Sequence, residues 1–365
     1  MVLKDVTNIQ NAMQKRNIFI ISTFFTAMVT CSLHVFHEKE TNHGPKDVRV
    51  CFYNVENLFD PYDDPQKNDD IFTYGNIKGW NDQRFRKKYL NIAKVIMGMG
   101  KGSPPGFIGL AEIENEFTVQ RLLYDTPLKY WNYGYVHKDS PDLRGIDLAV
   151  IYRKSVFELL KVKFIKVDLR GEYSRPTRYI LALTMKTYGH DTIAFIVNHW
   201  PSRYGGQLKS ECRRLEAAKK LTEVMDSIIV FHGLPLIIMG DFNDNPSDKS
   251  LLKVTSKKYG HPDKEQIKII NISYRIDFFG TLKYNAMWYT FDQILVSENL
   301  MNLGNNYYIA NKKTMVYHPD FLLCKDDNFP GEKPFRTFYG SRYLGGFSDH
   351  LPVYIDLKFN AKSSH

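Results

Sequence analysis

The sequence predicts an α/β protein in which two β-sheets pack together and helices cover the outside. Eight short runs rich in β-branched and aromatic residues are bounded by Gly, Pro, Asp or Asn, which is typical of strands. Two further stretches have the apolar periodicity of helices. Most connections between these elements are too short for repeated βαβ units, so packed sheets fit better than a doubly wound sheet.

The predicted strands are spread along the whole chain after residue 47. They cover residues 48–54, 106–113, 146–152, 178–186, 192–199, 235–240, 290–297 and 352–358. From Val48 onward the sequence contains no Ser/Gly-rich linker and no internal repeat. We therefore expect one large domain over 41–365, preceded by a leader and a polar linker in 1–40.

The two predicted helices cover residues 82–99 and 207–230. In each of them apolar residues recur every three or four positions, which places these residues on one face of a helix. The first face consists of Phe85, Tyr89, Ile92, Ile96 and Met99. The second consists of Leu208, Cys212, Leu215, Ala218, Leu221, Met225 and Ile228. We expect Cys212 to be a small buried hydrophobic residue on that face.

The composition is that of a globular protein with a basic surface. The chain has 365 residues, of which 43% are hydrophobic and 24% charged, which excludes disordered, collagenous and coiled-coil proteins. Its 4 cysteines exclude a disulfide-dense scaffold. The formal net charge of +9 favours an anionic partner such as nucleic acid or an anionic lipid surface. Without residues 1–40, Lys and Arg fall from 49 to 45 and Asp and Glu from 40 to 37, so the remaining domain keeps +8.

The N-terminal segment predicts export. Lys15 and Arg16 precede an apolar run that has no charge between Asn17 and Thr30. This run is shorter than the roughly 20 apolar residues of a transmembrane helix, but it fits the apolar region of a signal peptide. Cys31 follows at once, so lipid attachment to Cys31 and a membrane anchor are one alternative, and a plain exported protein is the other.

Polar residues gather at the ends of the predicted strands. They are Asn54, Glu112, Arg144, Asp147, Asn198, His199, Asp241, Asn243, Asp292, Asp349 and His350. A single Asp or Asn after a strand is usually a turn former, but six strand ends with such residues suggest one convergent site. Carboxylates, amides and imidazoles without a thiolate suit a hard, oxygen-ligated cation such as Mg²⁺.

The motifs at these strand ends form an ordered series, NVENLF, LAEIEN, RGID, NHWPSR, GDFND, FDQILVS and SDHLPV. In this order the chain resembles the endonuclease/exonuclease/phosphatase family, and the resemblance covers nearly all of 48–358. It implies a four-layer α/β sandwich of two packed mixed β-sheets flanked by helices. It also implies divalent-metal-dependent hydrolysis of phosphate esters.

The resemblance also implies roles for individual residues. Glu112 would be the principal Mg²⁺ ligand, assisted by Asn54 and Asp349, with Mn²⁺ as an alternative ion. Asp241 would align or deprotonate the attacking water, and Asn243 would hold a phosphate oxygen. His350, oriented by Asp292, would be the general acid/base or the transition-state stabiliser, and His199 would lie on the phosphate.

Three assignments come from chemical reasoning and not from the resemblance. His199 needs a carboxylate to fix its tautomer, and Asp147 is the candidate, with a turn Asp as the alternative. Arg144 and Arg203 could hold phosphate oxygens, because a guanidinium group matches that geometry. Arg203 could instead be a surface loop residue.

Two segments have alternative interpretations. Residues 61–70 contain four aspartates and could bind Ca²⁺, but they lack the glycine and the final Glu of an EF-hand, so we expect a solvated loop. Residues 305–347 interleave aromatic residues with cations, which suits either a nucleic-acid groove or a packed, irregular insertion.

The sequence therefore predicts an exported, monomeric, Mg²⁺-dependent phosphodiesterase that acts as a nuclease on DNA or RNA. The nearest alternative keeps the mechanism but takes a phospholipid or an inositol phosphate as substrate. A binding module without catalytic activity is a third hypothesis, and the intact set of site residues argues against it. Nothing in the sequence distinguishes DNA from RNA or endonucleolytic from exonucleolytic cleavage.

Overall fold

The computed structural model describes residues 47–360, except 101, 170–174 and 262–265. The predicted leader and Cys31 lie outside the described residues. Among the residues described, no helix is both long and apolar enough to cross a membrane.

Most strands of the first sheet come from the N-terminal part of the chain. Its strand order is β14 (Tyr307–Ile309), β20 (Val353–Phe359), β1 (Asp47–Leu58), β2 (Phe107–Ile113), β4 (Asp147–Arg153) and β3 (Tyr133–His137). The short strand β15 (Met315–Val316) also pairs with β20. β1 and β2 run parallel and the other neighbours antiparallel, so this sheet is mixed.

The second sheet consists of strands from the middle of the chain. Its order is β5 (Phe157–Ile165), β6 (Ile180–Thr187), β7 (Thr192–His199), β8 (Leu236–Asp241), β13 (Asp292–Ser297), β10 (Ile267–Asn271) and β9 (Lys258–Tyr259). β7 and β8 are parallel, and the remaining pairs are antiparallel. All eight predicted strands are therefore present, each within a few residues of its expected ends.

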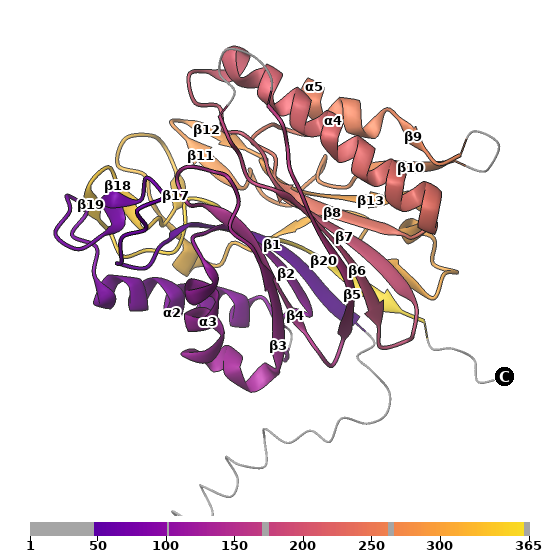
Figure 1. Cartoon of the computed structure of the whole chain (residues 1–365), viewed down its shortest axis with the longest axis horizontal. Helices are drawn as coiled ribbons and strands as arrows, with labels where there is room; N and C mark the ends of the chain where they lie inside the picture. The colour runs from indigo at the N-terminus through magenta and orange to yellow at the C-terminus, as the bar shows by residue number, and fades with distance from the viewer. Residues whose placement is uncertain (1–46, 101, 170–174, 262–265, 361–365) are drawn as a thin grey trace, which may run out of the picture. The chain divides into compact units, whose positions relative to one another are not determined.

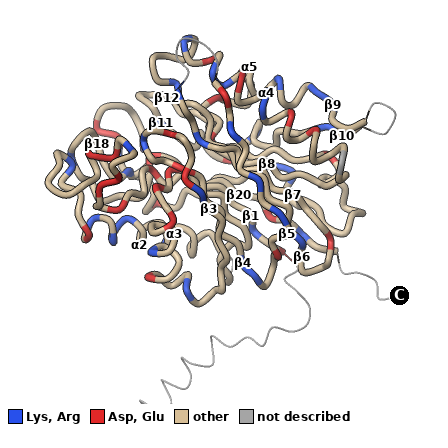
Figure 2. Tube along the Cα trace, in the orientation of Figure 1, with Lys and Arg blue, Asp and Glu red and all other residues tan. Residues whose placement is uncertain are grey.

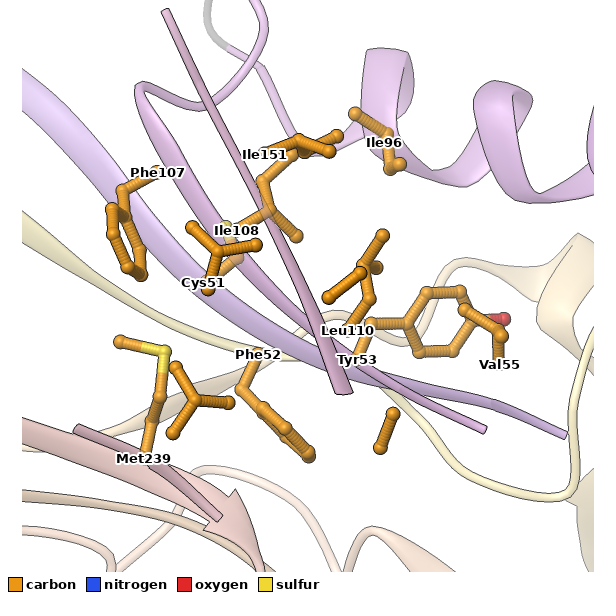
Figure 3. Packing of buried hydrophobic residues seen from close by; sticks show 14 of the residues in the cluster. Cys51, Phe52, Tyr53, Val55, Ile96, Phe107, Ile108, Leu110, Ile151 and Met239 are labelled. Carbon is orange, nitrogen blue, oxygen red and sulfur yellow. The ribbon is translucent and has the colours of Figure 1, made fainter. Parts of the chain in front are cut away.

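The two sheets pack face to face through apolar side chains. Phe107 of the first sheet stacks on Phe195 of the second, with their ring centroids 3.9 Å apart. Phe52 and Met239 also lie in this buried layer (Figure 3). Helices α2 (Asp82–Gly98) and α3 (Glu116–Tyr124) cover the outer face of the first sheet, and α4 (Gln207–His232) and α5 (Lys249–Thr255) cover that of the second (Figure 1). The four-layer sandwich is confirmed.

Helix α2 begins and ends where its sequence indicates. Asn81 caps the helix by accepting a hydrogen bond from the backbone N–H of Arg84 at 3.1 Å. The predicted apolar face is buried, including Ile92 and Ile96, which are fully inaccessible. The helix stops at Gly98, before the glycine- and proline-rich segment that ends at Gly106.

Helix α4 buries the second half of its predicted apolar face, including Ala218, Leu221 and Met225, but not the first half. Leu208 is 83% exposed and Cys212 is exposed, so the expectation that Cys212 is buried is wrong. Arg214 is fully buried instead, with its Nε 2.7 Å from a carboxylate oxygen of Asp244. A charged residue can enter the core here because its partner comes from the loop after β8, which the helix periodicity cannot reveal.

The segment 305–347 is mainly a packed insertion. It contains β14, β15, and two small hairpins formed by β16 (Leu323–Lys325) with β17 (Glu332–Pro334) and β18 (Phe338–Tyr339) with β19 (Arg342–Tyr343). Phe338 is buried against Phe72 and Trp80, while Tyr339 is 57% exposed. Of the two interpretations of this segment, the structure favours the packed insertion.

A third hairpin lies before the insertion, next to the site. β11 (Leu282–Tyr284) pairs with β12 (Met287–Tyr289), and Leu282 forms an isolated bridge with His350. Several large apolar side chains on and beside this hairpin face solvent: Phe279 is 77%, Tyr284 66% and Met287 61% exposed. The hairpin therefore places an exposed apolar edge beside His350.

Candidate active site

Three neighbouring strands of the second sheet bring polar side chains to the same level. In the strand register, Asp241 at the end of β8 pairs with His199 at the end of β7 on one side and with Asp292 at the start of β13 on the other. All three side chains are nearly inaccessible to solvent. Predicted site residues that are far apart in the sequence thus meet at one edge of the sheet.

The first sheet contributes Asn54 and Glu112. Asn54 Nδ2 donates to Asp241 Oδ2 at 3.0 Å and lies 3.5 Å from Glu112 Oε1. Glu112 Oε1 is 4.0 Å from His199 Nε2. The amide group of Asn54 therefore lies between a carboxylate from each sheet, which joins the two halves of the site.

A β-bulge places Glu112 in the site. Ala111 pairs with Leu148 and Ile113 with Asp147, so Glu112 is the extra residue on β2. Its φ of 65° lies in the left-handed region, which costs a non-glycine residue on the order of 1–3 kcal/mol. The backbone N–H of Asn57 compensates in part by donating to Glu112 Oε2 at 2.9 Å. Strain of this kind is concentrated at functional sites.

The predicted His350–Asp292 pair is present. His350 Nδ1 lies 2.7 Å from Asp292 Oδ2, and both side chains are buried. Burial by itself lowers the pKa of His350, but the charges of Asp292 and Asp241 outweigh burial and raise that pKa well above its ordinary value. These carboxylates favour the imidazolium form of His350, whose Nε2 lies 3.8 Å from Asp241 Oδ2.

His199 has the opposite electrostatic environment. Its Nε2 lies 3.5 Å from Asp241 Oδ2, and its Nδ1 has no hydrogen-bond partner among the described residues. Burial, followed by the positive charges of Arg178, Arg144 and His350, lowers the pKa of His199 well below its ordinary value. These surroundings favour the neutral imidazole form of His199.

The structure does not bring Asp147 to His199. Side chains alternate between the two faces of a strand. Tyr152 pairs with Phe107, whose ring stacks on the second sheet, so Leu148 also faces that sheet and Asp147 faces away from it. Asp147 lies instead beside His137 and Asp139. The alternation thus explains why the expected pairing does not form.

Asp241 and Asn243 are linked through a tight turn after β8. The backbone N–H of Asn243 donates to Asp241 Oδ1 at 2.9 Å, and its Nδ2 donates to the carbonyl oxygen of Trp200 at 3.0 Å. Asn243 has a φ of 52°, so a left-handed turn directs its amide back to the site. Burial, partly offset by His350, raises the pKa of Asp241.

Asp349 is engaged by a residue that the sequence analysis did not identify. Arg336 Nη2 lies 2.9 Å from Asp349 Oδ2 and 3.0 Å from Glu56 Oε1. Glu56 is buried and also accepts from the backbone N–H of Thr337 at 2.6 Å. Two features of the sequence could have indicated this cluster of Arg336, Asp349 and Glu56. Glu56 lies in the NVENLF motif, and the insertion carries several cations.

Arg144 and Arg203 have different surroundings. The side chain of Arg144 is 53% exposed, lies 3.4 Å from Asp142, and is close enough to lower the pKa of His199. Arg203 forms ion pairs with Asp244 at 3.1 Å and with Asp248 at 2.6 Å, and its Nε donates to the carbonyl oxygen of Asn243. Arg144 can thus reach a ligand, whereas Arg203 holds the loop after β8.

The sequence analysis missed a buried arginine, Arg178, whose charge acts on His199. Arg178 Nη1 donates to Asp142 Oδ2 at 2.9 Å, and Nη2 donates to the carbonyl oxygen of Trp200 at 2.6 Å. Its side chain is 3% exposed. Arg178 therefore connects the loop before β4, which carries Arg144, to the end of β7.

Comparison with known proteins assigns this arrangement to a family. A sequence model described as the Endonuclease/Exonuclease/phosphatase family matches residues 49–359. The chain belongs to the endonuclease/exonuclease/phosphatase family. Members of this family are divalent-metal-dependent hydrolases of phosphate esters, so the protein is an enzyme of that class. The sequence matches none of the curated proteins.

Solved structures share the family fold. A family protein from Bacteroides thetaiotaomicron aligns at 16% identity and a TM-score of 0.55, over 87% of this chain and 97% of that one. The mannosyl-6-phosphatase of the same organism aligns at 17% and 0.55, over 86% and 100%. The human nocturnin catalytic domain with a bound sulfate aligns at 15% and 0.50, over 86% and 95%. At these identities the likeness shows the fold alone.

The residues of this phosphoesterase fit a divalent cation bound through oxygen. The carboxylate of Glu112 is partly open to solvent, with 18% of the side chain exposed, and Asp349 has 26% exposed. Both carboxylates are thus partly accessible to a solvent ion, and Asn54 adds an amide close to Glu112. Hard oxygen donors of this kind suit Mg²⁺ or Mn²⁺. Ligand atoms of Asp241, Asp292 and His350 also lie within 4.8 Å of one another, but His350 and Asp292 are paired.

The acidic segment 61–70 is mostly exposed, as expected for a solvated loop, but one of its aspartates is buried. Asp69 is 1% exposed, and Asp64 donates its backbone N–H to Asp69 Oδ2 at 3.1 Å. Glu114 is also buried there and accepts from the backbone N–H of Asp60 at 2.6 Å. Glu116 lies in the first turn of α3, whereas Glu114 lies outside the helix.

Proposed function

We propose that the protein is a Mg²⁺-dependent phosphodiesterase that hydrolyses DNA or RNA. The observation that carries the proposal is the buried group of Asp241, His199, His350 and Asp292 beside the apolar edge of the β11–β12 hairpin. Exposed aromatic side chains such as Phe279 and Tyr284 can stack on bases, while cations contact the backbone of the substrate.

The electrostatics of the buried residues support hydrolysis of a phosphate ester. The positive charge on His350 can stabilise the charge that develops on phosphate oxygens, and it can protonate the leaving oxygen. His199, which is neutral, can donate from Nε2 to a phosphate oxygen near Asp241. Asp241 can hold the attacking water, because its raised pKa makes it an effective base near neutral pH.

The metal would be held by Glu112 with Asn54 and Asp349. When bound, a divalent cation supplies Lewis-acid stabilisation of the phosphate charge. Arg144 can add a bidentate contact to the phosphate, since its guanidinium is exposed. Arg336, which already pairs with Asp349, fixes the orientation of that carboxylate.

The test is an activity assay with Mg²⁺, with Mn²⁺ and with EDTA. We expect cleavage of supercoiled plasmid or RNA that EDTA abolishes and Mg²⁺ restores. Glu112→Gln should lose most of the metal-dependent turnover, because several kcal/mol of stabilisation depend on the ion. Glu158→Gln, a change at an exposed carboxylate of β5, is the matched control. Activity that resists EDTA or survives Glu112→Gln would contradict the proposal.

A phospholipid or inositol-phosphate substrate is the second candidate. The exposed Phe279 and Met287, on and next to the hairpin whose Leu282 bridges to His350, favour it, because an apolar hairpin can also enter a lipid surface. The same assay should therefore include sphingomyelin vesicles, inositol phosphates and mannose 6-phosphate. Turnover of lipid without turnover of nucleic acid would select the second candidate.

We also propose that the enzyme is exported and works as a monomer. The cationic residues and the apolar run in 15–30 support the first part. Mass spectrometry of the mature protein from cells should show removal of the leader, and a diacylglyceryl adduct on Cys31 would identify a lipid anchor. Light scattering should give the mass of one chain, and a dimer would contradict the second part.

A further inference from the structure

The connection between β3 and β4 carries a second group of ligating side chains. One ligand atom each from His137, Asp139 and Asp147 lies within 4.8 Å of the other two. Asp147 and Ala149 share a face of β4, and His137 pairs with Ala149 across the strands, so the group lies on the face of the first sheet that points away from the second. It is therefore separate from Asn54 and Asp241, which lie between the sheets.

Asp147 is the most unusual member of this group. It is 1% exposed, and neither of its carboxylate oxygens forms a hydrogen bond of normal geometry with any residue that the structure describes. Burial raises the pKa of its carboxyl group, and the nearby Ser140, His137 and Lys67 only partly offset this effect. A buried carboxylate that the nearby Ser140, His137 and Lys67 stabilise only in part, without a well-formed hydrogen bond, is costly, and a bound cation would offset this cost.

The hydrogen bonds of His137 point to the same conclusion. Its Nδ1 lies 3.1 Å from the carbonyl oxygen of Leu148, which can only accept, so Nδ1 carries the proton. In the neutral ring, Nε2 then presents a lone pair to Asp139 Oδ1 at 3.1 Å. Two acceptors this close repel each other unless a proton or a metal ion lies between them.

The geometry is compatible with a shared metal ion. Atoms bound to one tetrahedral Zn²⁺ at about 2.1 Å are separated by roughly 3.4 Å, so the Nε2–Oδ1 separation of 3.1 Å needs only a small adjustment to hold the ion. The side chain of His137 is 2% exposed and that of Asp139 66%, so the group is buried on one side and open to solvent on the other. Lys67, whose charge acts on Asp139 and Asp147, donates to the backbone carbonyls of Ser140 and Asp142.

We propose that His137, Asp139 and Asp147 bind a divalent transition-metal ion of the Zn²⁺ or Mn²⁺ class. One imidazole with two carboxylates selects these ions over Ca²⁺, which takes oxygen ligands. The ion joins the end of β3 to the start of β4 and so closes the loop 138–146. That loop carries Asp142, the partner of Arg178, and the exposed Arg144. The site therefore stabilises a loop beside the catalytic centre without taking part in the reaction.

The experiment uses the full chain with Glu112→Gln, so that binding at the catalytic centre does not obscure the second site. The protein is treated with EDTA and dialysed against Zn²⁺, and bound zinc is measured by mass spectrometry. We expect one Zn²⁺ per chain, and a rise in the melting temperature with Zn²⁺ that Ca²⁺ does not produce. Adding Asp147→Asn should weaken Zn²⁺ binding at least about tenfold.

Two further variants make the result decisive. Asp139→Asn changes an exposed ligand, so it tests the site even if Asp147→Asn does not fold. Asp168→Asn removes an exposed carboxylate that pairs with Lys166, and it should keep the bound zinc. Equal zinc binding in all variants, or no bound zinc in Glu112→Gln, would overturn the proposal and leave His137 as an imidazolium between two aspartates.

Discussion

The two histidines of the catalytic centre differ in charge although both are buried. His350 has Asp292 at 2.7 Å, whereas His199 has Arg178 and Arg144 nearby and no partner for Nδ1 within the described part of the chain. The pKa of His350 is consequently raised and that of His199 lowered. Because the two pKa values move apart, His350 can act as a cation while His199 acts as a neutral hydrogen-bond donor.

Substitutions of His350 and Asp292 should show that the two act as a unit. His350→Ala should reduce kcat roughly 10²–10⁴-fold, because it removes a proton donor and a positive charge. Asp292→Asn should cause a comparable loss by releasing the wrong tautomer. The double variant should be hardly slower than the slower single variant, as measured by single-turnover kinetics.

The affinity for Mg²⁺ should stay the same in all three variants. Additive losses of rate at the two positions would contradict the pairing. A large loss of Mg²⁺ affinity in His350→Ala would instead make that histidine a metal ligand.

Glu114 should make the stability of the protein depend on pH. Burial, with the charges of Asp60, Asp69 and Asp64, raises the pKa of Glu114 from 4.5 to about 9. Between these values the folded protein holds a proton that the unfolded chain has released. The contribution of Glu114 to the free energy of unfolding is therefore fully present below the lower pKa. Above it, this contribution falls as the pH rises, by up to about 1.4 kcal/mol per pH unit.

Glu114→Gln removes this titration, so its melting temperature at pH 8 should exceed that of the unsubstituted protein. At pH 5 the two should nearly coincide. Thermal unfolding from pH 5 to pH 8 measures the melting temperatures of the two proteins. Glu116→Gln, on an exposed carboxylate two residues further on, is the matched control. Parallel pH profiles for Glu114→Gln and the unsubstituted protein would contradict the prediction.

Helix α4 is attached to the second sheet partly by a buried ion pair. Arg214 lies 2.7 Å from Asp244, which also accepts from Arg203 and from the hydroxyl of Ser250 at 2.6 Å. The pair connects the first half of the helix to the loop that carries Asn243. The apolar residues of the second half, including Leu221 and Met225, pack in the core formed with β7 and β8.

Arg214→Leu should destabilise the protein by up to about 3–5 kcal/mol, because it leaves the buried Asp244 with fewer partners. Arg203 and Ser250 remain on Asp244, so the loss should fall at the lower end of this range. Urea denaturation measures it. The same change at the neighbouring Arg213, which is only partly buried and donates to the carbonyl oxygen of Tyr204, should cost about 1 kcal/mol. Equal losses at both positions would contradict the role of the pair.

At the scale of the whole molecule, the charge of the domain predicts how it binds a polyanion. Basic and acidic residues are interspersed along the chain (Figure 2), and the domain without residues 1–40 keeps a net charge of +8. If the substrate is nucleic acid, the apparent affinity should fall steeply between about 50 and 200 mM salt, because each neutralised phosphate releases counterions. Fluorescence anisotropy with a labelled oligonucleotide and EDTA present measures this dependence. A flat response would favour a small substrate or a lipid.

The sequence by itself determined the positions of eight strands and of helices α2 and α4, and most of the residues that meet at the centre of the site, whereas α3, α5 and strands such as β3 and β5 were not predicted. Strands and helices are recognised from the local spacing of apolar and polar residues. Any fold that buries one face of these elements keeps the same spacing. The ordered motifs placed Asn54, Glu112, Asp241 and His350 at strand ends, and strands of packed sheets bring such ends together. Local pattern therefore predicted packed sheets and a convergent group of polar residues at strand ends, and the family resemblance added the four-layer architecture and the roles of the catalytic residues.

Only the tertiary structure decided which face each polar residue occupies and which partner it meets. Asp147 faces away from His199 because the strand register sets its side, and the sequence of β4 is apolar on both faces. Arg214 is buried and Cys212 exposed because Asp244 arrives from another element. Arg336 reaches Asp349 across a turn in the insertion. Partners of buried charges come from distant parts of the chain, and no local pattern specifies them.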